Sequence, residues 1–168
     1  MDIKSKLGSL KLIALILVIL LPFFGLSACN RHIEQAGEAE QLNFIFPKGK
    51  RGSSETFTGA AYNYPLVMDG ELTTMVGNVY FEPGARSNWH THPAGQILII
   101  TDGKGYHQIE GESLQELKKG DIAVCPPNKK HWHGASPEMG MQQLYIVPNT
   151  EKGVVNWMEA VTDVQYGN

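Results

Sequence analysis

The sequence is poor in cysteine. Its 168 residues contain two, Cys29 and Cys125. Cys29 ends a leader segment described below, which leaves Cys125 without a partner, so we expect no internal disulfide even in an oxidising compartment. Cys125 stands in the apolar run Ile-Ala-Val-Cys, and we interpret it as a small buried side chain rather than a reactive thiol.

An excess of positive charge is also missing. Lys and Arg number 14 against 17 Asp and Glu, which gives a formal net charge of -3 at pH 7. Nucleic-acid binding normally requires a basic patch, so the sequence gives no reason to expect a nucleic-acid partner. Hydrophobic residues make up 42% of the chain and charged residues 18%, which excludes a disordered or wholly membrane-embedded protein. We find no internal repeat.

The N-terminus has the pattern of an export signal. Lysines precede a long apolar stretch that closes on the small residues Leu-Ser-Ala-Cys at positions 26–29. This ending matches a bacterial lipobox, in which the cysteine is lipidated. We therefore predict a lipoprotein signal peptide at residues 1–28, a lipid anchor on Cys29, and an exported protein at the membrane, facing the periplasm or the cell surface. The alternative is an uncleaved anchor, because the stretch approaches the roughly 18 residues of a spanning helix.

The remainder divides into a polar tether at residues 29–55 and a domain at residues 56–168. Short apolar runs separated by Gly, Pro and Asp turns predict an all-β sandwich or small barrel. The expected strands lie within 71–84, 95–111, 114–127 and 141–147. Asp-Gly-Lys-Gly at 102–105 indicates a hairpin within the second of these segments. Residues 154–166 look helical, and we expect an amphipathic helix that covers the barrel.

Strand alternation predicts which side chains point inward. If Val79 faces the interior, then so do the residues two positions away on its strand and an alternating set on the last strand. The sets are Gly77, Val79 and Phe81, and Gln143, Tyr145 and Val147. Trp89 and Trp132 should face outward and serve packing or a subunit contact.

Five of the six histidines lie between residues 90 and 133, and four form two His-x-His pairs. In a strand, residues i and i+2 share a face, so His90 and His92 can point at one ion, and so can His131 and His133. The Pro-Ala-Gly turn can bring the amide oxygen of Gln96 to the same place.

Imidazole nitrogens suit first-row transition ions, and a glutamine carbonyl adds a neutral oxygen. Three histidines and one oxygen would leave positions open for water or substrate, as in catalytic sites. The alternative is that the histidines face solvent from loops. His107 fits neither pair and is expected to be exposed on a strand, as is His32 in the tether.

Two segments carry a resemblance to the cupin family. Gly84 to Gln96 resembles the first cupin motif, with Gln96 where glutamate is usual. Gly120 to His131 resembles the second motif, with Asn128 in place of a glycine at a position expected to need positive φ. The resemblance implies a single-domain cupin, a double-stranded β-helix or jelly-roll barrel with a short C-terminal helix. It also implies a metal inside, held by His90, His92, Gln96 and His131.

From about residue 56 to 166 the chain is similar to small bacterial cupins that include manganese-dependent hydroxynitrile lyases. This similarity implies Mn(II) as the cofactor, with Fe(II), Zn(II) or Ni(II) as alternatives, a small-molecule substrate and a homodimer. His133 is then the candidate general acid or base, and the alternative is a histidine that only orients the ligands. The cyanohydrin-cleaving relatives carry histidine at the place of Gln143, which we assign to the site as a hydrogen-bonding group.

Three functions remain open at this point. A neutral Gln96 leaves the charge of a divalent ion uncompensated, which favours an anionic ligand and a lyase acting on a small oxygenated substrate. A metal-dependent dioxygenase and a non-catalytic small-molecule-binding module are the alternatives. Oxygen consumption would separate the first two, and binding without turnover would identify the third.

Overall fold

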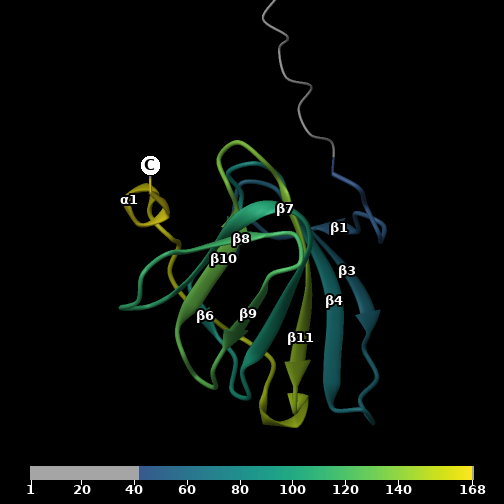
Figure 1. Cartoon of the computed structure of the whole chain (residues 1–168). Helices are drawn as coiled ribbons and strands as arrows, with labels where there is room; N and C mark the ends of the chain where they lie inside the picture. The colour runs from purple at the N-terminus through teal and green to yellow at the C-terminus, as the bar shows by residue number, and fades with distance from the viewer. Residues whose placement is uncertain (1–41, 168) are drawn as a thin grey trace, which may run out of the picture. The chain divides into compact units, whose positions relative to one another are not determined.

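The computed structural model describes residues 42–167 (Figure 1). The predicted signal peptide, the lipidation site Cys29, His32 and the first part of the tether lie outside the described residues. Within residues 42–167, no helix is both long enough and apolar enough to span a membrane.

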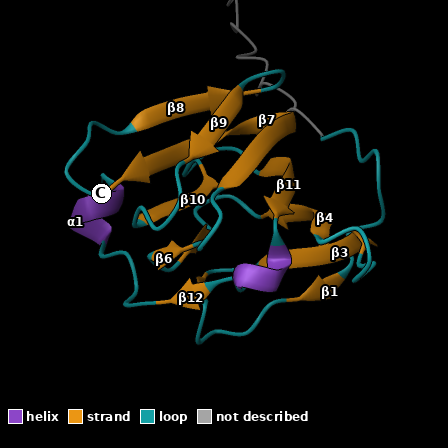
Figure 2. Cartoon of the chain, turned by 90° about the horizontal axis from the view of Figure 1, so that it is seen from below, coloured by secondary structure: helices purple, strands orange, loops and turns teal. Residues whose placement is uncertain are grey.

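The described part of the chain forms one curled antiparallel sheet of twelve strands (Figure 2). The main path of neighbours is β1-β3-β4-β11-β7-β10-β5-β2, with β8 and β9 on β7, β6 on β10 and β12 on β6. The strands are β1 Lys50–Arg51, β2 Phe57–Thr58, β3 Ala61–Val67, β4 Thr74–Phe81, β5 Arg86–Ser87, β6 His90–Thr91, β7 Gln96–Ile109, β8 Gln115–Lys118, β9 Ile122–Cys125, β10 His131–Ala135, β11 Met141–Pro148 and β12 Asn156–Trp157. A 3₁₀ turn, η1 Thr150–Lys152, and a short helix, α1 Asp163–Tyr166, complete the fold. The predicted all-β class and the jelly-roll architecture are confirmed.

The hairpin predicted around residues 102–105 is wrong, because β7 runs through it without turning. The first part of β7 pairs with β11 and β9, and the second part pairs with β10 and β8. The pairing with β11 shifts register at Thr101, between Ile100 and Asp102, and Gly103 two residues later adopts a φ of 79°. Such a bulge changes the phase of the side chains along the strand. Even-numbered residues are buried before Gly103, and odd-numbered residues are buried after it.

His107 was expected to be exposed because it fits neither His-x-His pair; this was wrong, and the bulge accounts for its burial. Before the bulge, the odd-numbered residues of β7 face outward. After the bulge, they face inward, and His107 is accordingly only 3% exposed.

One buried hydrophobic cluster forms the main core of the barrel. Its buried members come from all the long strands. They include every hydrophobic residue of the two inward-facing sets predicted from the sequence; the other two members of those sets are Gly77 and Gln143. They are Ala61, Val79, Phe81, Ala85, Leu98, Ile100, Leu117, Ala123, Cys125, Ala135, Met141, Tyr145 and Val147. Gln143 is itself completely buried beside them. Each fully buried aliphatic or aromatic side chain contributes roughly 1.5–3 kcal/mol.

The helix predicted at 154–166 is wrong for most of its length. Residues 156–157 form β12, which pairs with β6 through Asn156 with Thr91 and Trp157 with His90. The otherwise free edge of β6 needs a hydrogen-bonding partner, and this tertiary requirement overrides the helical pattern. The helix α1 begins only at Asp163, and its N-cap Thr162 forms a reciprocal capping box with Gln165.

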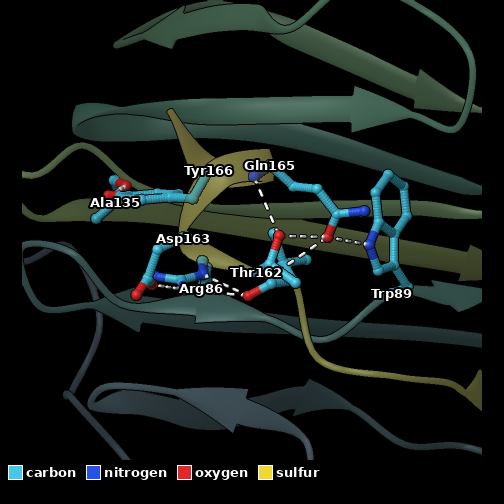
Figure 3. A network of polar contacts seen from close by, with 8 residues as sticks. Arg86, Trp89, Ala135, Thr162, Asp163, Gln165 and Tyr166 are labelled. Carbon is cyan, nitrogen blue, oxygen red and sulfur yellow. Dashed lines mark hydrogen bonds and ion pairs between the residues drawn. The ribbon is translucent and has the colours of Figure 1, made fainter. Parts of the chain in front are cut away.

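Hydrogen bonds attach the C-terminal helix and the residues just before it to the barrel wall (Figure 3). Arg86 donates hydrogen bonds to the Val161 carbonyl (3.0 Å) and to the Asp163 carboxylate (2.6 Å), and Tyr166 donates to the Ala135 carbonyl (2.6 Å). A second buried cluster, consisting of Trp89, Trp132, Val161 and Tyr166, lies beneath it. The two tryptophans therefore point away from the barrel interior, as predicted, and serve intramolecular packing.

Part of the predicted tether lies against the barrel. β1 pairs with β3, and the Asn43 N–H donates to the Asp102 carboxylate (2.6 Å). The Phe44 ring meets the Tyr80 ring edge-on, with centroids 4.9 Å apart. These contacts attach residues 43–51 to the outer face of the sheet.

Candidate metal centre

Three buried histidines converge inside the barrel. His90, His92 and His131 each offer one ring nitrogen, and the three atoms lie within 4.8 Å of one another, a group that could hold a metal ion. β6 and β10 bring them together, because His90 and His131 are direct antiparallel partners. His92 follows β6 on the same side, as the spacing of two residues predicted.

Each of these histidines is oriented by a backbone carbonyl. The Nδ1 contacts are His90 to Asn88 O (2.9 Å), His92 to Val154 O (2.5 Å) and His131 to Lys129 O (2.9 Å). A carbonyl only accepts, so Nδ1 carries the proton and Nε2 presents its lone pair to the interior. This is how metal-binding histidines are usually held. Nε2 of His92 is buried and has no hydrogen-bond partner among residues 42–167, as expected for an atom that binds a metal.

Burial keeps these rings neutral. Desolvation lowers the pKa of His131 to about 4, and it lowers the pKa of His92 as well. The pKa of His90 lies well below its usual value, because desolvation and the neighbouring His131 both oppose its charge. The neutral imidazole is the form that binds a metal, so the protein supplies its ligands without first removing protons.

Gln96 brings an amide oxygen to the same place. It is the first residue of β7 and is buried, and its Oε1 lies 3.3 Å from Nε2 of His131. An amide is neutral and offers an oxygen as a fourth ligand. The four residues predicted as metal ligands are therefore gathered in one buried cluster.

His133 lies two residues after His131 on β10 but has different surroundings. Its ring centroid is 5.2 Å from that of His90, and its Nδ1 is 3.0 Å from Nε2 of Gln143. A Gln143 NH₂ group that donates to Nδ1 leaves the His133 proton on Nε2. A half-turn of the amide would instead let its oxygen accept from an Nδ1–H and free the lone pair of Nε2. The Gln143 side chain therefore controls which nitrogen of His133 carries the proton.

Known proteins match this chain in sequence and in fold. A cupin domain model matches residues 77–147. The chain is 44% identical over 117 residues to (R)-mandelonitrile lyase from Granulicella tundricola, covering 69% of this chain and 89% of that protein. The chain belongs to the cupin family.

Solved structures agree with this assignment. A cupin-like protein from Thermotoga maritima superposes with a TM-score of 0.73 at 45% identity, over 74% of this chain and 95% of that one. The dimethylsulfoniopropionate (DMSP) lyase DddQ from Ruegeria pomeroyi has a TM-score of 0.54 at 19% identity, over 73% of this chain and 63% of that one, and shares the fold alone.

This cupin departs from the second family motif at Asn128. The residue has a φ of 60°, in the left-handed region where glycine is favoured and asparagine is tolerated. Its N–H donates to the His92 carbonyl (2.9 Å). The substitution therefore keeps the turn that joins the second motif to the first.

The cupin interior also holds a histidine and thiol pair that the sequence analysis missed. His107 Nε2 lies 3.2 Å from Cys125 Sγ, and its Nδ1 lies 3.2 Å from Gln115 Oε1. Gln115 accepts from Nδ1–H, so the thiol faces the lone pair of Nε2. Burial raises the pKa of the Cys125 thiol to about 12, so it stays protonated and unreactive, as interpreted from the sequence.

A cavity of about 140 Å³ opens beside the histidines of this cupin. None of the described residues that line it is Asp, Glu, Lys or Arg. The lining is Phe57, Asn63, Met75, Val79, His90, His92, Gln96, His133, Tyr145, Val147, Val154, Val155 and Trp157.

Much of this wall lies outside the two motifs. Phe57, Asn63, Met75 and Trp157 were not among the predicted site residues. Period-two alternation along 61–67 could have assigned Asn63 to the inner face. Trp157 was assigned to a helix, whereas its ring packs against His90 with centroids 4.9 Å apart.

Proposed function

We propose that this cupin is a metal-dependent lyase that cleaves a cyanohydrin into an aldehyde and hydrogen cyanide. The observation that carries the proposal is the convergence of three histidine ring nitrogens beside a small cavity that His133 also lines, and whose described lining residues include no Asp, Glu, Lys or Arg. The 44% identity to a protein named (R)-mandelonitrile lyase supports the choice of reaction.

His90, His92, Gln96 and His131 would hold the ion. Mn(II) is our first choice from the sequence similarity, followed by Fe(II), Zn(II) and Ni(II), because these donors suit several ions. A bound ion would supply Lewis acidity that stabilises negative charge on an oxygen or on cyanide.

His133 would move the proton. With the Gln143 oxygen accepting from Nδ1–H, the free Nε2 accepts the proton of the substrate hydroxyl. The oxygen then forms the carbonyl, the bond between the carbinol carbon and the nitrile carbon breaks, and its electron pair leaves on cyanide. Nε2 returns the proton to cyanide, so that HCN and the aldehyde are released and His133 is regenerated.

Cyanide release tests this function. The full protein, loaded separately with each of the four metals, is mixed with mandelonitrile, and cyanide and benzaldehyde are both quantified. We expect equimolar products, none from protein stripped by a chelator, and restored activity after refilling. Failure with all four metals would overturn the proposal. Oxygen consumption in its place would identify the dioxygenase, and binding without turnover would identify a binding module.

We also propose that the protein is exported and anchored through a lipid on Cys29. The lipobox at residues 26–29 supports this localisation. Labelling cells with a radioactive fatty acid should mark the protein, and Cys29→Ser should abolish the label and release the protein from the membrane fraction. Label retained by the variant would contradict the proposal. The homodimer implied by the family resemblance stays a prediction, which the mass of the purified protein in solution tests.

A further inference from the structure

The cavity has a second polar group at some distance in sequence from both motifs. Asn63 on β3 and Tyr145 on β11 both line it. The Tyr145 hydroxyl donates a hydrogen bond to the Asn63 amide oxygen (3.3 Å). The proposed reaction uses neither side chain, and this pair sits among the apolar residues Met75, Val79 and Val147 of the same wall.

A glycine on the intervening strand makes this contact possible. β4 lies between β3 and β11, where Tyr145 pairs with Gly77 and Asn63 pairs with Val79. A Cβ at Gly77 would overlap Oη and Cζ of Tyr145, so the ring passes over the position where any other residue would have a side chain. The phenol can therefore cross one strand and reach Asn63.

The pair retains capacity for one more partner. Its internal hydrogen bond uses the hydroxyl hydrogen and the amide oxygen, which leaves the Asn63 NH₂ group and a lone pair on the Tyr145 oxygen. Tyr145 is 8% exposed, and burial raises the pKa of its hydroxyl, so the phenol stays neutral at physiological pH. Polar groups in an apolar wall are favourable only when they are hydrogen-bonded, which makes this position selective for a ligand with a matching group.

The size of the cavity limits what can reach the pair. Its 140 Å³ is close to the roughly 150 Å³ of cavities that hold benzene. Phe57 and Trp157 form an aromatic corner beside it, with ring centroids 5.6 Å apart. The cavity therefore has room for one aromatic ring in contact with wall residues that include both the histidines and the Asn63–Tyr145 pair.

We propose that Asn63 and Tyr145 select substrates whose aromatic ring carries a hydroxyl group remote from the reacting carbon. The substrate class is then hydroxyaryl cyanohydrins, together with the hydroxybenzaldehydes that they release. This inference rests on the proposed function for the reaction, but it concerns a separate group of residues. The ring hydroxyl donates to the Tyr145 oxygen and accepts from the Asn63 amide.

Binding of the aldehydes tests the pair independently of turnover. Isothermal titration of the metal-loaded protein with benzaldehyde, 3-hydroxybenzaldehyde and 4-hydroxybenzaldehyde measures the preference directly. We expect at least one hydroxylated aldehyde to bind about tenfold more tightly than benzaldehyde, as one added hydrogen bond to a buried group predicts. Tyr145→Phe and Asn63→Leu should each remove most of this preference while leaving the affinity for benzaldehyde within about threefold. Gly77→Ala should do the same by displacing the Tyr145 ring.

Tyr62→Phe is the matched control. Tyr62 neighbours Asn63 on β3, does not line the cavity, and stacks on Tyr80 outside it at 6.2 Å between centroids. The Tyr62→Phe variant also loses a phenolic oxygen, but it should keep the full preference for the hydroxylated aldehyde. The inference is overturned if neither hydroxylated aldehyde binds more tightly than benzaldehyde, or if the preference survives in both Tyr145→Phe and Asn63→Leu. If the protein cleaves mandelonitrile but shows no preference for hydroxylated aldehydes, the proposed lyase function stands and the proposed selectivity is wrong. If it shows the preference but releases cyanide from no cyanohydrin, the selectivity stands and the lyase function is wrong.

Discussion

The two His-x-His pairs of this cupin have the same spacing and different surroundings. His90 and His92 both fix Nδ1 on a backbone carbonyl, and both direct Nε2 to the centre of the site. His131 does the same, whereas Nδ1 of His133 meets the side chain of Gln143. A carbonyl fixes one tautomer, but an amide that can turn permits either. The comparison teaches that spacing sets the direction of a histidine, while the partner of its second nitrogen sets its role.

Removing the first pair should have the largest effect. We expect His90→Ala/His92→Ala to lower the metal content from about one ion per chain to nearly none and to abolish cyanide release, because two of three nitrogen ligands are lost. Elemental analysis of the purified variant measures this. Near-normal metal content in a folded double variant would show that the ion is bound elsewhere.

Replacing His133, the second histidine of the other pair, should lower the reaction rate without removing the metal. We expect His133→Ala to retain the ion and to lose about 10²–10⁴-fold in kcat, the usual contribution of a general acid or base. Steady-state cyanide release gives the rate, and the metal content of the same sample is its control. A loss of less than tenfold would remove His133 from the proton transfer.

Gln143→Leu tests the side chain that contacts Nδ1 of His133. We expect a roughly 10–100-fold loss of kcat with the metal retained, because leucine cannot accept the Nδ1–H of His133 that leaves Nε2 free as the base. Gln142→Leu is the matched control on the opposite face of β11, where Gln142 accepts a hydrogen bond from Thr101 (3.2 Å). This control should lower stability by about 1 kcal/mol and leave kcat unchanged. Equal rates in the two variants would contradict a role for Gln143.

The smallest effect concerns the fifth histidine of the site region. Nδ1 of His107 meets the Gln115 amide oxygen, and its Nε2 meets the Cys125 thiol and not the centre of the site. We expect Cys125→Ala to lower the free energy of unfolding by about 1–2 kcal/mol through a small cavity and an unpaired Nε2, with metal content and kcat nearly unchanged. Urea unfolding measures the first, and the cyanide assay the second. A large loss of metal would mean that Cys125 supports the ligands through Gln96, from which its Sγ lies 4.0 Å.

The sequence predicted those parts of the site that depend on local spacing. The two pairs, Gln96, and the inward sets on β4 and β11 follow from alternation along single strands. His107 was expected to be exposed because it belongs to neither His-x-His pair, and the bulge at Thr101 that turns it inward lies beside glycines that equally indicate a hairpin. The segment after Gly153 was misassigned because its pairing partner, β6, lies more than 60 residues earlier. Asn63 was missed because its contact with Tyr145 depends on the absence of a side chain at Gly77.

The most direct test of the central claim is the metal content of His131→Ala beside His133→Ala, measured by elemental analysis after loading with Mn(II). Both variants lose a buried imidazole from β10, but only His131 belongs to the convergent group of ring nitrogens, and Nδ1 meets a backbone carbonyl in His131 and the Gln143 side chain in His133. We predict that His131→Ala loses the ion and that His133→Ala keeps about one per chain. Equal occupancy in the two variants, whether full or empty, would contradict the division of roles between the paired histidines.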